Sequence, residues 1–374
     1  MADGTIMQQP EPTIEPAAGP DTLPGPQAPR RRRMPSLRRS GVGEQAVRFE
    51  NVTKRFGKEE VLHGITFRVP WGEILGVIGP SGSGKTTTIR MMLGIYKPSS
   101  GTVRLFGRDP WKLRRGDRER IGYMPQDFVL YPALTVEENL RFAASLYGVP
   151  WWETGRRIKT LLPFVDLMDA RTRRAEDLSG GMRRRLSLAA TLMHDPDFLV
   201  LDEPTAGIDP ILRTSIWDGL KDAREDGKTM VITTQYVSEA EYCDQVLLVH
   251  EGAIIAAGTP AELRHAATGG EMLDIRFDQP RPDIVMRLQA LPFVHEVEAL
   301  DRPEDIRVIV DNVATDLPEL SAYCDREEGG CISMEPHVLT FDDVFVRLVS
   351  GAHDAEQDQH DGNPRDPSSP PVAA

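Results

Sequence analysis

The stretch Gly79-Pro80-Ser81-Gly82-Ser83-Gly84-Lys85-Thr86 has the pattern G-x-x-x-x-G-K-T of the phosphate-binding loop called Walker A. An apolar run at 74–78 precedes it and suits a buried strand, and residues 87–93 suit the helix that the motif requires. The glycines permit a tight turn whose backbone N–H groups point at phosphate oxygens, and the helix dipole adds to the attraction. We expect Lys85 to reach the β- and γ-phosphates and the Thr86 hydroxyl to bind Mg²⁺.

Length and composition limit the kinds of protein that are compatible with this motif. The 374 residues suffice for one large domain and a smaller one, and the net charge of −13 argues against general nucleic-acid binding. No apolar run approaches the roughly 18 residues of a membrane-spanning helix, and the polar, proline-rich N-terminus does not resemble a signal peptide. Cys243, Cys324 and Cys331 form no C-x-x-C pair, which disfavours a zinc site and fits a reducing cytosol, although Cys324 and Cys331 could still pair.

A second element of a phosphate site follows the apolar run 198–201, where a buried strand is predicted to end in Asp202-Glu203. Four apolar residues followed by two carboxylates form the Walker B pattern. We expect the strand to hold Asp202 beside Mg²⁺, usually through water, and Glu203 to orient and deprotonate the water that attacks the γ-phosphate. Such a pair is also common as a solvated turn, but a Walker A loop in the same chain favours the functional interpretation.

Three further features have a functional and a structural interpretation. Phe56 could stack on an adenine ring, or it could be an ordinary half-buried aromatic of a strand. The amide oxygen of Gln126, at a strand end, could reach Mg²⁺ or the attacking water, which is a weak signal by itself. Leu178-Ser179-Gly180-Gly181-Met182 begins a predicted helix, where a hydroxyl and backbone N–H groups can bind an anion, although Ser179 would also serve as a plain N-cap.

Strands and helices alternate over 46–265, which favours an α/β core with a largely parallel sheet. Thr135 and Glu138 predict a capping box for a helix over 135–147. The other helices expected in this region are 153–167, 217–224 and 238–243, the last with Ser238 as its cap.

A smaller α+β unit is expected over 266–350. Its predicted strands are 272–277, 295–300 and 306–310, and its predicted helices are 283–291, 317–324 with Pro318 in the first turn, and 340–348. Residues 1–45 are rich in proline and arginine and are expected to form a disordered tail, with attraction to anionic lipid as the alternative. The acidic tail 351–374 is also expected to be disordered.

The order of the Walker A loop, Gln126, the L-S-G-G run, the Walker B strand and Asp209 resembles the nucleotide-binding subunit of an ATP-binding cassette (ABC) transporter, over about 47–263. The resemblance implies that Phe56 stacks on adenine and that Gln126 belongs to the Q-loop, which couples nucleotide state to a membrane subunit. It implies a helical subdomain at about 127–174. It also implies that the L-S-G-G signature contacts the ATP of a partner cassette in a head-to-tail dimer, and that Asp209 crosses that interface.

A closer resemblance is to the daunorubicin-resistance type of exporter ATPase. It rests on T-T-Q-Y at 233–236 and on F-D-D-V-F at 341–345 in the C-terminal unit. One departure from the wider family is Gln235, which replaces the switch histidine. A β-branched strand precedes Gln235 and would aim it at the γ-phosphate beside Glu203, where an amide can donate and accept but does not titrate.

These resemblances imply an ATP-binding and hydrolysing subunit that uses Mg²⁺ and powers an exporter of a drug, lipid or similar compound. The expected partners are a separate transmembrane permease and a second ATP-binding subunit in a homodimer, and no nucleic acid. The expected place is the cytoplasmic face of the membrane, as a peripheral subunit. An importer subunit is an alternative, and so is a non-transport ABC ATPase acting on ribosomes or DNA, although one Walker A and no sustained heptads disfavour the latter.

The candidate residues form four groups. The catalytic candidates are Lys85, Glu203 and Gln235, and the Mg²⁺ candidates are Thr86, Gln126 and Asp202. The nucleotide-binding candidates are Phe56, Gly79, Pro80, Ser81, Gly82, Ser83, Gly84, Lys85, Thr86, Thr87, Gln126 and Asp202. The candidates for the ATP of a partner are Leu178, Ser179, Gly180, Gly181, Met182 and Asp209.

Overall fold

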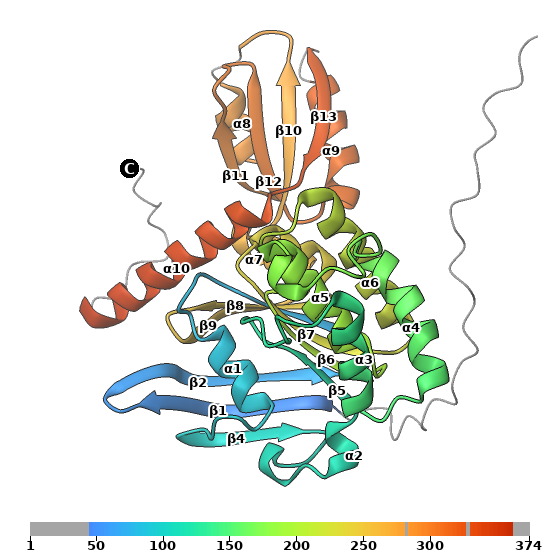
Figure 1. The fold of residues 1–374 in the computed structure, drawn as a ribbon. Coiled ribbons are helices and arrows are strands. Elements are labelled where there is room, and N and C mark those ends of the chain that lie inside the picture. Colours follow the sequence, from blue (N-terminus) through green and yellow to red (C-terminus); the bar gives the residue numbers. More distant parts are fainter. Residues whose placement is uncertain (1–44, 281–282, 327–329, 362–374) are drawn as a thin grey trace, which may run out of the picture. The chain divides into compact units, whose positions relative to one another are not determined.

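The computed structural model of the chain describes residues 45–280, 283–326 and 330–361 (Figure 1). A six-stranded sheet with the order β5-β6-β7-β3-β8-β9 holds the predicted Walker strands at its centre. The first five strands are parallel and β9 pairs antiparallel with β8, which confirms the largely parallel sheet. The strands are β3 (Ile74–Ile78), β5 (Ile121–Met124), β6 (Phe198–Asp202), β7 (Thr229–Thr234), β8 (Gln245–His250) and β9 (Ala253–Gly258).

The central strands are apolar throughout because both faces of this sheet are covered. In β3, alternate side chains enter two different cores, as the two-residue period of a strand requires. Ile74 and Ile78 pack in a core with the helices, whereas Leu75 and Val77 pack in a second core. The second core also holds an antiparallel sheet of order β2-β1-β4, made of β1 (Gln45–Phe56), β2 (Glu59–Pro70) and β4 (Ser100–Leu105).

Helices and short 3₁₀ segments connect these strands. They are α1 (Lys85–Met92), η1 (Pro110–Lys112), α2 (Arg115–Arg118), α3 (Val136–Leu146), α4 (Trp151–Phe164), η2 (Ala175–Asp177), α5 (Gly180–Leu192), α6 (Pro210–Glu225), η3 (Val237–Tyr242) and α7 (Pro260–Thr268). The capping box predicted for α3 is confirmed: the Glu138 amide donates to the Thr135 hydroxyl, and the Thr135 amide donates to the Glu138 carboxylate. Helix α4 ends at Phe164, earlier than the predicted 167.

Two helix predictions near the candidate site are wrong. Helix α6 begins at Pro210 rather than near 217, because Asp209 caps it and proline suits its first position. The helix predicted at 238–243 with a serine cap is the 3₁₀ segment η3, whose N-cap is Tyr236 and which has no side-chain cap.

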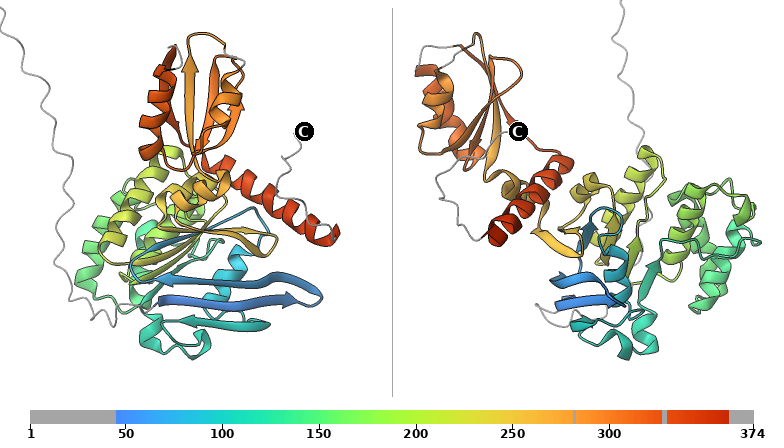
Figure 2. Two further views of the ribbon diagram at one scale, coloured as in Figure 1. Left: turned by 180° about the vertical axis from the view of Figure 1, so that it is seen from behind. Right: turned by 90° about the vertical axis from the view of Figure 1, so that its left-hand side faces the viewer.

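The C-terminal unit has the chain order β10-α8-β11-β12-α9-β13 and the sheet order β11-β12-β10-β13, with antiparallel neighbours. This is the ferredoxin-like arrangement, and it agrees with the expected α+β class. Helices α8 and α9 lie on the same face of the sheet (Figure 2) and share a core with it. Its elements are β10 (Glu271–Phe277), α8 (Ile284–Gln289), β11 (Val294–Ala299), β12 (Asp305–Val310), α9 (Val313–Arg326) and β13 (Cys331–His337).

Three details of the C-terminal unit correct the expectations. Strand β13 was not expected; it pairs with β10 alone, as an edge strand, where Pro336 is tolerated. Helix α9 starts at Val313, so Pro318 lies inside it rather than in its first turn. The last helix, α10 (Phe341–Asp361), continues past the predicted tail boundary at 351.

The first turn of α10 is fixed to the cassette. Phe341 and Val344 are buried in the same core as Leu263 of α7. The Arg264 guanidinium carbon lies 4.7 Å from the centroid of the Phe341 ring, and its Nε donates to the Leu339 carbonyl oxygen at 3.3 Å. The N-terminal tail up to residue 44 and residues 362–374 lie outside the described residues. Within the described ranges, no helix is both long and apolar enough to cross a membrane.

Candidate active site

The Walker A loop lies between β3 and α1, as the sequence predicts, and two of its glycines are required by their surroundings. A Cβ atom on Gly79 would lie 2.0 Å from the Val249 carbonyl oxygen. Gly84 has φ +99°, and a Cβ atom there would lie 2.5 Å from a methyl carbon of Leu62. A side chain at Gly79 would therefore force the backbone to move, and the left-handed φ of Gly84 is strained for any residue that has a Cβ atom. The loop thus presents its backbone directly at the start of α1.

Lys85 is the first residue of α1, and its side chain folds back over the loop. It is 5% exposed, and its ammonium group donates to the carbonyl oxygens of Gly79 at 2.7 Å and Pro80 at 2.8 Å. Burial lowers the pKa of Lys85, and the nearby charges of Glu203 and Asp202 oppose that shift. The group is therefore held at the mouth of the loop, facing two carboxylates.

Asp202, at the end of β6, lies against hydroxyl groups from two other elements. It is fully buried and accepts hydrogen bonds from Thr86 at 3.1 Å and from Thr233 at 2.5 Å. Burial raises the pKa of Asp202, and these two hydroxyls act in the opposite direction. Thr86 and Asp202 thus place hard oxygen donors at one point, which is the ligand type that Mg²⁺ prefers.

Glu203 lies between two glutamines that follow the ends of different strands, β5 and β7. Its carboxylate accepts from Gln235 Nε2 at 2.7 Å and from Gln126 Nε2 at 3.2 Å. Its backbone is left-handed, with φ +52°, and its amide donates to the Thr233 carbonyl oxygen at 3.0 Å. A non-glycine residue with positive φ is uncommon and is retained where neighbours fix it. The ends of β5, β6 and β7 therefore bring together three predicted site residues.

The signature and Asp209 have structural roles within the chain. The Ser179 hydroxyl accepts from the Met182 amide at 3.2 Å and caps α5, as predicted, while Leu178 is buried in the core. Gly181 lies so close to Gly207 that a Cβ atom would be 2.8 Å from its carbonyl oxygen. Asp209 caps α6 by accepting from the Leu212 amide at 3.0 Å. Their contact with the ATP of a partner stays a prediction.

A hollow lies between the Q-loop at Gln126 and the start of α5, the helix that follows the signature. Gln126, Gly181 and Gly207 line it. Arg184 also lines it, and its guanidinium donates to the Gln126 carbonyl oxygen at 2.8 Å. This arginine is absent from the sequence-based candidates, because nothing in an arginine run shows which member turns inward.

Phe56 ends β1 with a partly exposed ring. Its exposed fraction is 41%, and its ring meets the edge of Tyr96 with the centroids 5.3 Å apart. Lys54 lies 4.7 Å from the ring centroid. The ring is therefore available on one side for stacking, and its contact with adenine stays a prediction.

Sequence reasoning also missed Thr233 as a partner of Asp202. The two residues are directly paired in the register of β6 and β7. The run of two threonines before Gln235 is a signal that could have found it, since a hydroxyl on a strand beside Walker B faces the same sheet edge.

The glycine-rich loop between a buried parallel strand and a helix, with carboxylates at the end of a neighbouring strand, defines a nucleotide-binding protein of the P-loop class. Within that class the chain belongs to the ABC transporter family of ATP-binding proteins. The family model described as ABC transporter matches residues 62–206. The Nod factor export ATP-binding protein I of Paraburkholderia xenovorans (strain LB400) is 39% identical over 256 residues, which are 68% of this chain and 83% of that protein.

Two other comparisons agree with this membership. The probable multidrug ABC transporter ATP-binding protein YbhF of Escherichia coli (strain K12) is 39% identical over 237 residues, or 63% of this chain. This chain spans 41% of the length of YbhF. A solved dimeric structure of the ATP-binding cassette MJ0796 in a post-hydrolysis state with ADP and Pi has a TM-score of 0.53 at 27% identity, covering 57% of this chain and 98% of that one. The expected fold class is thereby confirmed.

Proposed function

We propose that this chain is the ATP-binding and ATP-hydrolysing subunit of an exporter that moves a drug, a lipid or a similar compound. The observation that carries the proposal is the position of Glu203. Its carboxylate is held by Gln126 and Gln235, one residue from the buried Asp202, which accepts a hydrogen bond from Thr86. A carboxylate that is held by neutral amides beside a phosphate loop is suited to act on a water molecule.

In this proposal the Walker A loop binds the phosphates of ATP. The backbone N–H groups of residues 79–86 and the N-terminus of α1 surround them, and the Lys85 ammonium contacts the β- and γ-phosphates. Phe56 stacks on the adenine ring. Thr87, the third residue of α1, continues the phosphate-facing turn.

The residues present also fit a bound Mg²⁺. Thr86 and Asp202 are already in contact, and Gln126 can add an amide oxygen from the neighbouring strand end. When bound, the ion would neutralise charge on the β- and γ-phosphates. The buried Thr233 hydroxyl orients Asp202 for this role.

Glu203 and Gln235 carry the chemical step. Glu203 accepts a proton from water, the water oxygen bonds to the γ-phosphorus, and the bond from that phosphorus to the ADP oxygen breaks, which gives ADP and phosphate. Gln235 donates to the Glu203 carboxylate through its amide and can turn the same group toward the γ-phosphate. Neither function requires a change of charge on Gln235.

The exporter part of the proposal concerns partners. Ser179, Gly181 and Asp209 would meet the ATP site of a second copy in a head-to-tail homodimer. The names of the relatives mention multidrug transport and Nod factor export. A separate membrane permease would receive the motion through the Q-loop at Gln126, and the subunit would lie on the cytoplasmic face of the membrane.

The test combines hydrolysis in solution with export in cells. Purified chain should hydrolyse ATP with Mg²⁺, and Lys85→Ala should abolish hydrolysis because it removes a charge-assisted phosphate contact. A strain that lacks the gene should become more sensitive to at least one toxic compound in a panel, and the wild-type gene should restore resistance. The Lys85→Ala gene should not restore it, whereas a control change at the 90% exposed Arg115, Arg115→Met, should.

Three outcomes would contradict the proposal. Normal hydrolysis by Lys85→Ala would remove the Walker A loop from the reaction. Hydrolysis that is intact but stimulated by ribosomes or DNA, with no sensitivity to any compound, would assign the chain to a non-transport ATPase. Loss of uptake of a nutrient in the deletion strain would instead indicate an importer.

A further inference from the structure

A polar cluster connects the segments that follow Glu203 and Gln235 in the chain, and the proposed reaction does not use it. Thr205 is fully buried and donates to Glu239 Oε1 at 2.6 Å, and Glu239 is 1% exposed. Arg213 reaches the same carboxylate from α6, with its Nε 3.9 Å from Oε1. A buried carboxylate that is paired with a cation depends strongly on where that cation lies.

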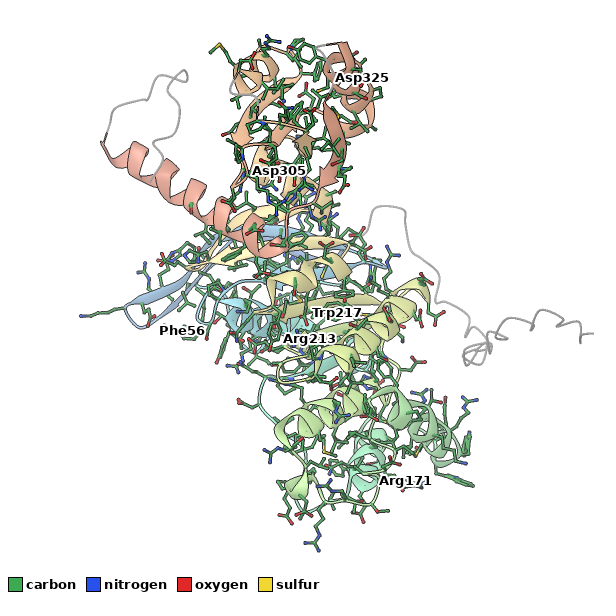
Figure 3. All side chains as sticks on the ribbon, turned by 90° about the horizontal axis from the view of Figure 1, so that it is seen from above. Phe56, Arg171, Arg213, Trp217, Asp305 and Asp325 are labelled. Atoms are coloured by element: carbon green, nitrogen blue, oxygen red, sulfur yellow. The ribbon has the colours of Figure 1, made fainter. Side chains whose placement is uncertain are left out.

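Arg213 contacts two residues that are chain neighbours of predicted site residues. One guanidinium nitrogen donates to the Ile208 carbonyl oxygen at 3.2 Å, directly before Asp209. The guanidinium carbon lies 4.1 Å from the centroid of the Tyr236 ring, directly after Gln235. Figure 3 labels Arg213 and Trp217, which come from the same helix, α6.

Helix α6 holds η3 at both of its ends. One turn beyond Arg213, the buried Trp217 stacks on Tyr242, the last residue of η3, with centroids 5.1 Å apart. Arg213 stacks on Tyr236, the N-cap of η3. Residues four apart lie on the same face of a helix, so both contacts come from that face of α6. The buried tryptophan anchors the far end, and the arginine fixes the end that carries Gln235.

We propose that Arg213 is a positioning residue that sets the place of Gln235 relative to the loop at Asp209. A planar guanidinium can stack on an aromatic ring and donate to a carbonyl in fixed directions, which an ammonium group cannot do at the same time. The Tyr236 amide donates to Thr234 Oγ1 at 3.0 Å, so the turn around Gln235 is short and constrained. Moving the Tyr236 ring therefore moves Gln235 and lengthens its 2.7 Å hydrogen bond to Glu203.

This inference rests on the proposed function, because it needs Gln235 to act in hydrolysis. It also gives the T-T-Q-Y run a physical reason: the tyrosine is the surface on which Arg213 rests. Since Asp209 and Ile208 are held by the same helix, a shift of the Asp209 loop on dimer formation would be passed to Gln235 of the same chain.

The experiment measures ATP turnover and the KM for ATP in the full chain. Arg213→Met should lower kcat by about ten- to a hundredfold, as expected for a misplaced polar contact, with the KM for ATP changed by less than about threefold. Arg213→Lys should not restore kcat. Tyr236→Ala should behave like Arg213→Met, and Tyr236→Phe should recover most of the turnover, since the ring is kept.

The same substitution in a Gln235→Ala chain distinguishes a positioning role of Arg213 from a general loss of stability. In a Gln235→Ala chain, Arg213→Met should cause less than about a twofold further loss, because the group that it positions is already gone. Thermal melting of each variant checks that it is folded. If Arg213→Met does not fold, Tyr236→Ala carries the same test, since Tyr236 is 37% exposed. Arg115→Met is the control for loss of an arginine.

A folded Arg213→Met chain with normal kcat would overturn the inference. So would a full additional loss in the Gln235→Ala background, because Arg213 would then act by another route. Failure of the proposed function is distinguishable, since the wild-type chain would itself not hydrolyse ATP.

Discussion

At the carboxyl edge of the parallel sheet, Asp202 and Glu203 accept hydrogen bonds from threonine hydroxyls and glutamine amides. On the face of the C-terminal sheet away from its helices, Asp274 accepts from Arg307 at 2.7 and 2.9 Å instead. Asp305 accepts from Arg276 at 2.7 and 3.1 Å. Carboxylates on one sheet are held by uncharged groups, and those on the other are neutralised by bidentate arginines.

The pKa values follow this difference. Burial raises the pKa of Asp202, and its hydroxyl partners only partly oppose that. Burial also acts to raise the pKa of Asp274, but hydrogen bonds from Arg307 and the charges of Arg307 and His337 outweigh it, so that the pKa falls. A carboxylate whose hydrogen bonds come from uncharged groups can still bind a metal ion or a water, whereas one that is paired with a bidentate arginine is already neutralised. Asp202 therefore has the environment of a reactive carboxylate, and Asp274 that of a structural one.

The largest effect is expected at Glu203, a carboxylate that is held by uncharged groups. Glu203→Gln keeps the shape of the side chain and removes the base, so hydrolysis should fall by about a hundred- to ten-thousandfold while ATP still binds. With Mg-ATP the variant should accumulate as a dimer, which light scattering would detect.

Asp274→Asn is the matched change in the C-terminal sheet. It loses the bidentate pair with Arg307, so it should lower the melting temperature and leave turnover within about twofold of wild type. Turnover of Glu203→Gln at the wild-type rate, or a monomer with ATP bound throughout, would contradict the assignment of the two carboxylates.

The next effect concerns Gln235, the neutral partner of Glu203. Gln235→Ala should reduce turnover by about ten- to a thousandfold, comparable to the loss of one preorganised polar contact. Gln235→His should keep much of the activity and gain an acid limb near the imidazole pKa of roughly 6.5, since only a histidine there changes charge. Turnover measured against pH for the three proteins decides this. An alanine variant as fast as wild type would leave Gln235 as a mere cap of its strand.

The sequence predicted those parts of the site that are local in the chain. The Walker A loop is contiguous, and its strand and helix follow from adjacent residues. Asp202 and Glu203 were found because an apolar strand leads directly into them. Asp209-Pro210 is also a local signal, because a cap followed by proline marks a helix start, and α6 begins at Pro210 rather than at the later residue predicted.

The remaining parts depend on contacts between distant segments. Thr233 meets Asp202 only because β6 and β7 pair in one register. Arg213 meets Tyr236 because α6 packs along η3, and an arginine in a helix carries no sign of which neighbour it will stack on. Strand β13 lacks strict alternation of apolar and polar residues and contains Pro336, so the sequence pattern did not predict its pairing with β10. Chain-local patterns thus locate the reactive groups, while the groups that position them need the tertiary structure.

A third prediction tests whether the two sheets are independent. Removal of the residues after Ala267 should leave nucleotide binding intact, because every nucleotide motif lies upstream. It should lower stability, since it uncovers the surface on which Phe341 and Val344 are buried. In the full chain, Phe341→Ala should lower the free energy of unfolding by about 3 kcal/mol, through loss of burial and of the Arg264 contact. A folded, soluble truncation that no longer binds ATP would show that nucleotide binding depends on the C-terminal unit.

The smallest effect is expected at Glu137, an ion-paired carboxylate inside the cassette. Hydrogen bonds from Arg171, and then from Arg141, lower the pKa of Glu137 from 4.5 to about 2. The side chain of Glu137 is 16% exposed, and it joins α3 to the loop after α4 through Arg171. Because the folded pKa lies below the ordinary value, this stabilisation is complete above about pH 5 and is lost as the pH falls toward 2.

Glu137→Gln should therefore lower the free energy of unfolding near neutral pH by on the order of 2 kcal/mol, a figure reduced because Arg171 is partly exposed. The difference from wild type should shrink as denaturant titrations are repeated from pH 7 down to about pH 4. In this range Glu137 takes up a proton in the unfolded chain but stays ionised in the folded one, so the unfolded state of the wild type becomes relatively more stable. Turnover at neutral pH should stay within about twofold, since Glu137 touches none of the site residues. Glu119→Gln, at an exposed pair with Arg115, should change stability by only a few tenths of a kcal/mol. A stability difference for Glu137→Gln that is the same at every pH would show that lost packing, not lost charge, is responsible, and Glu137 would no longer belong with the ion-paired carboxylates.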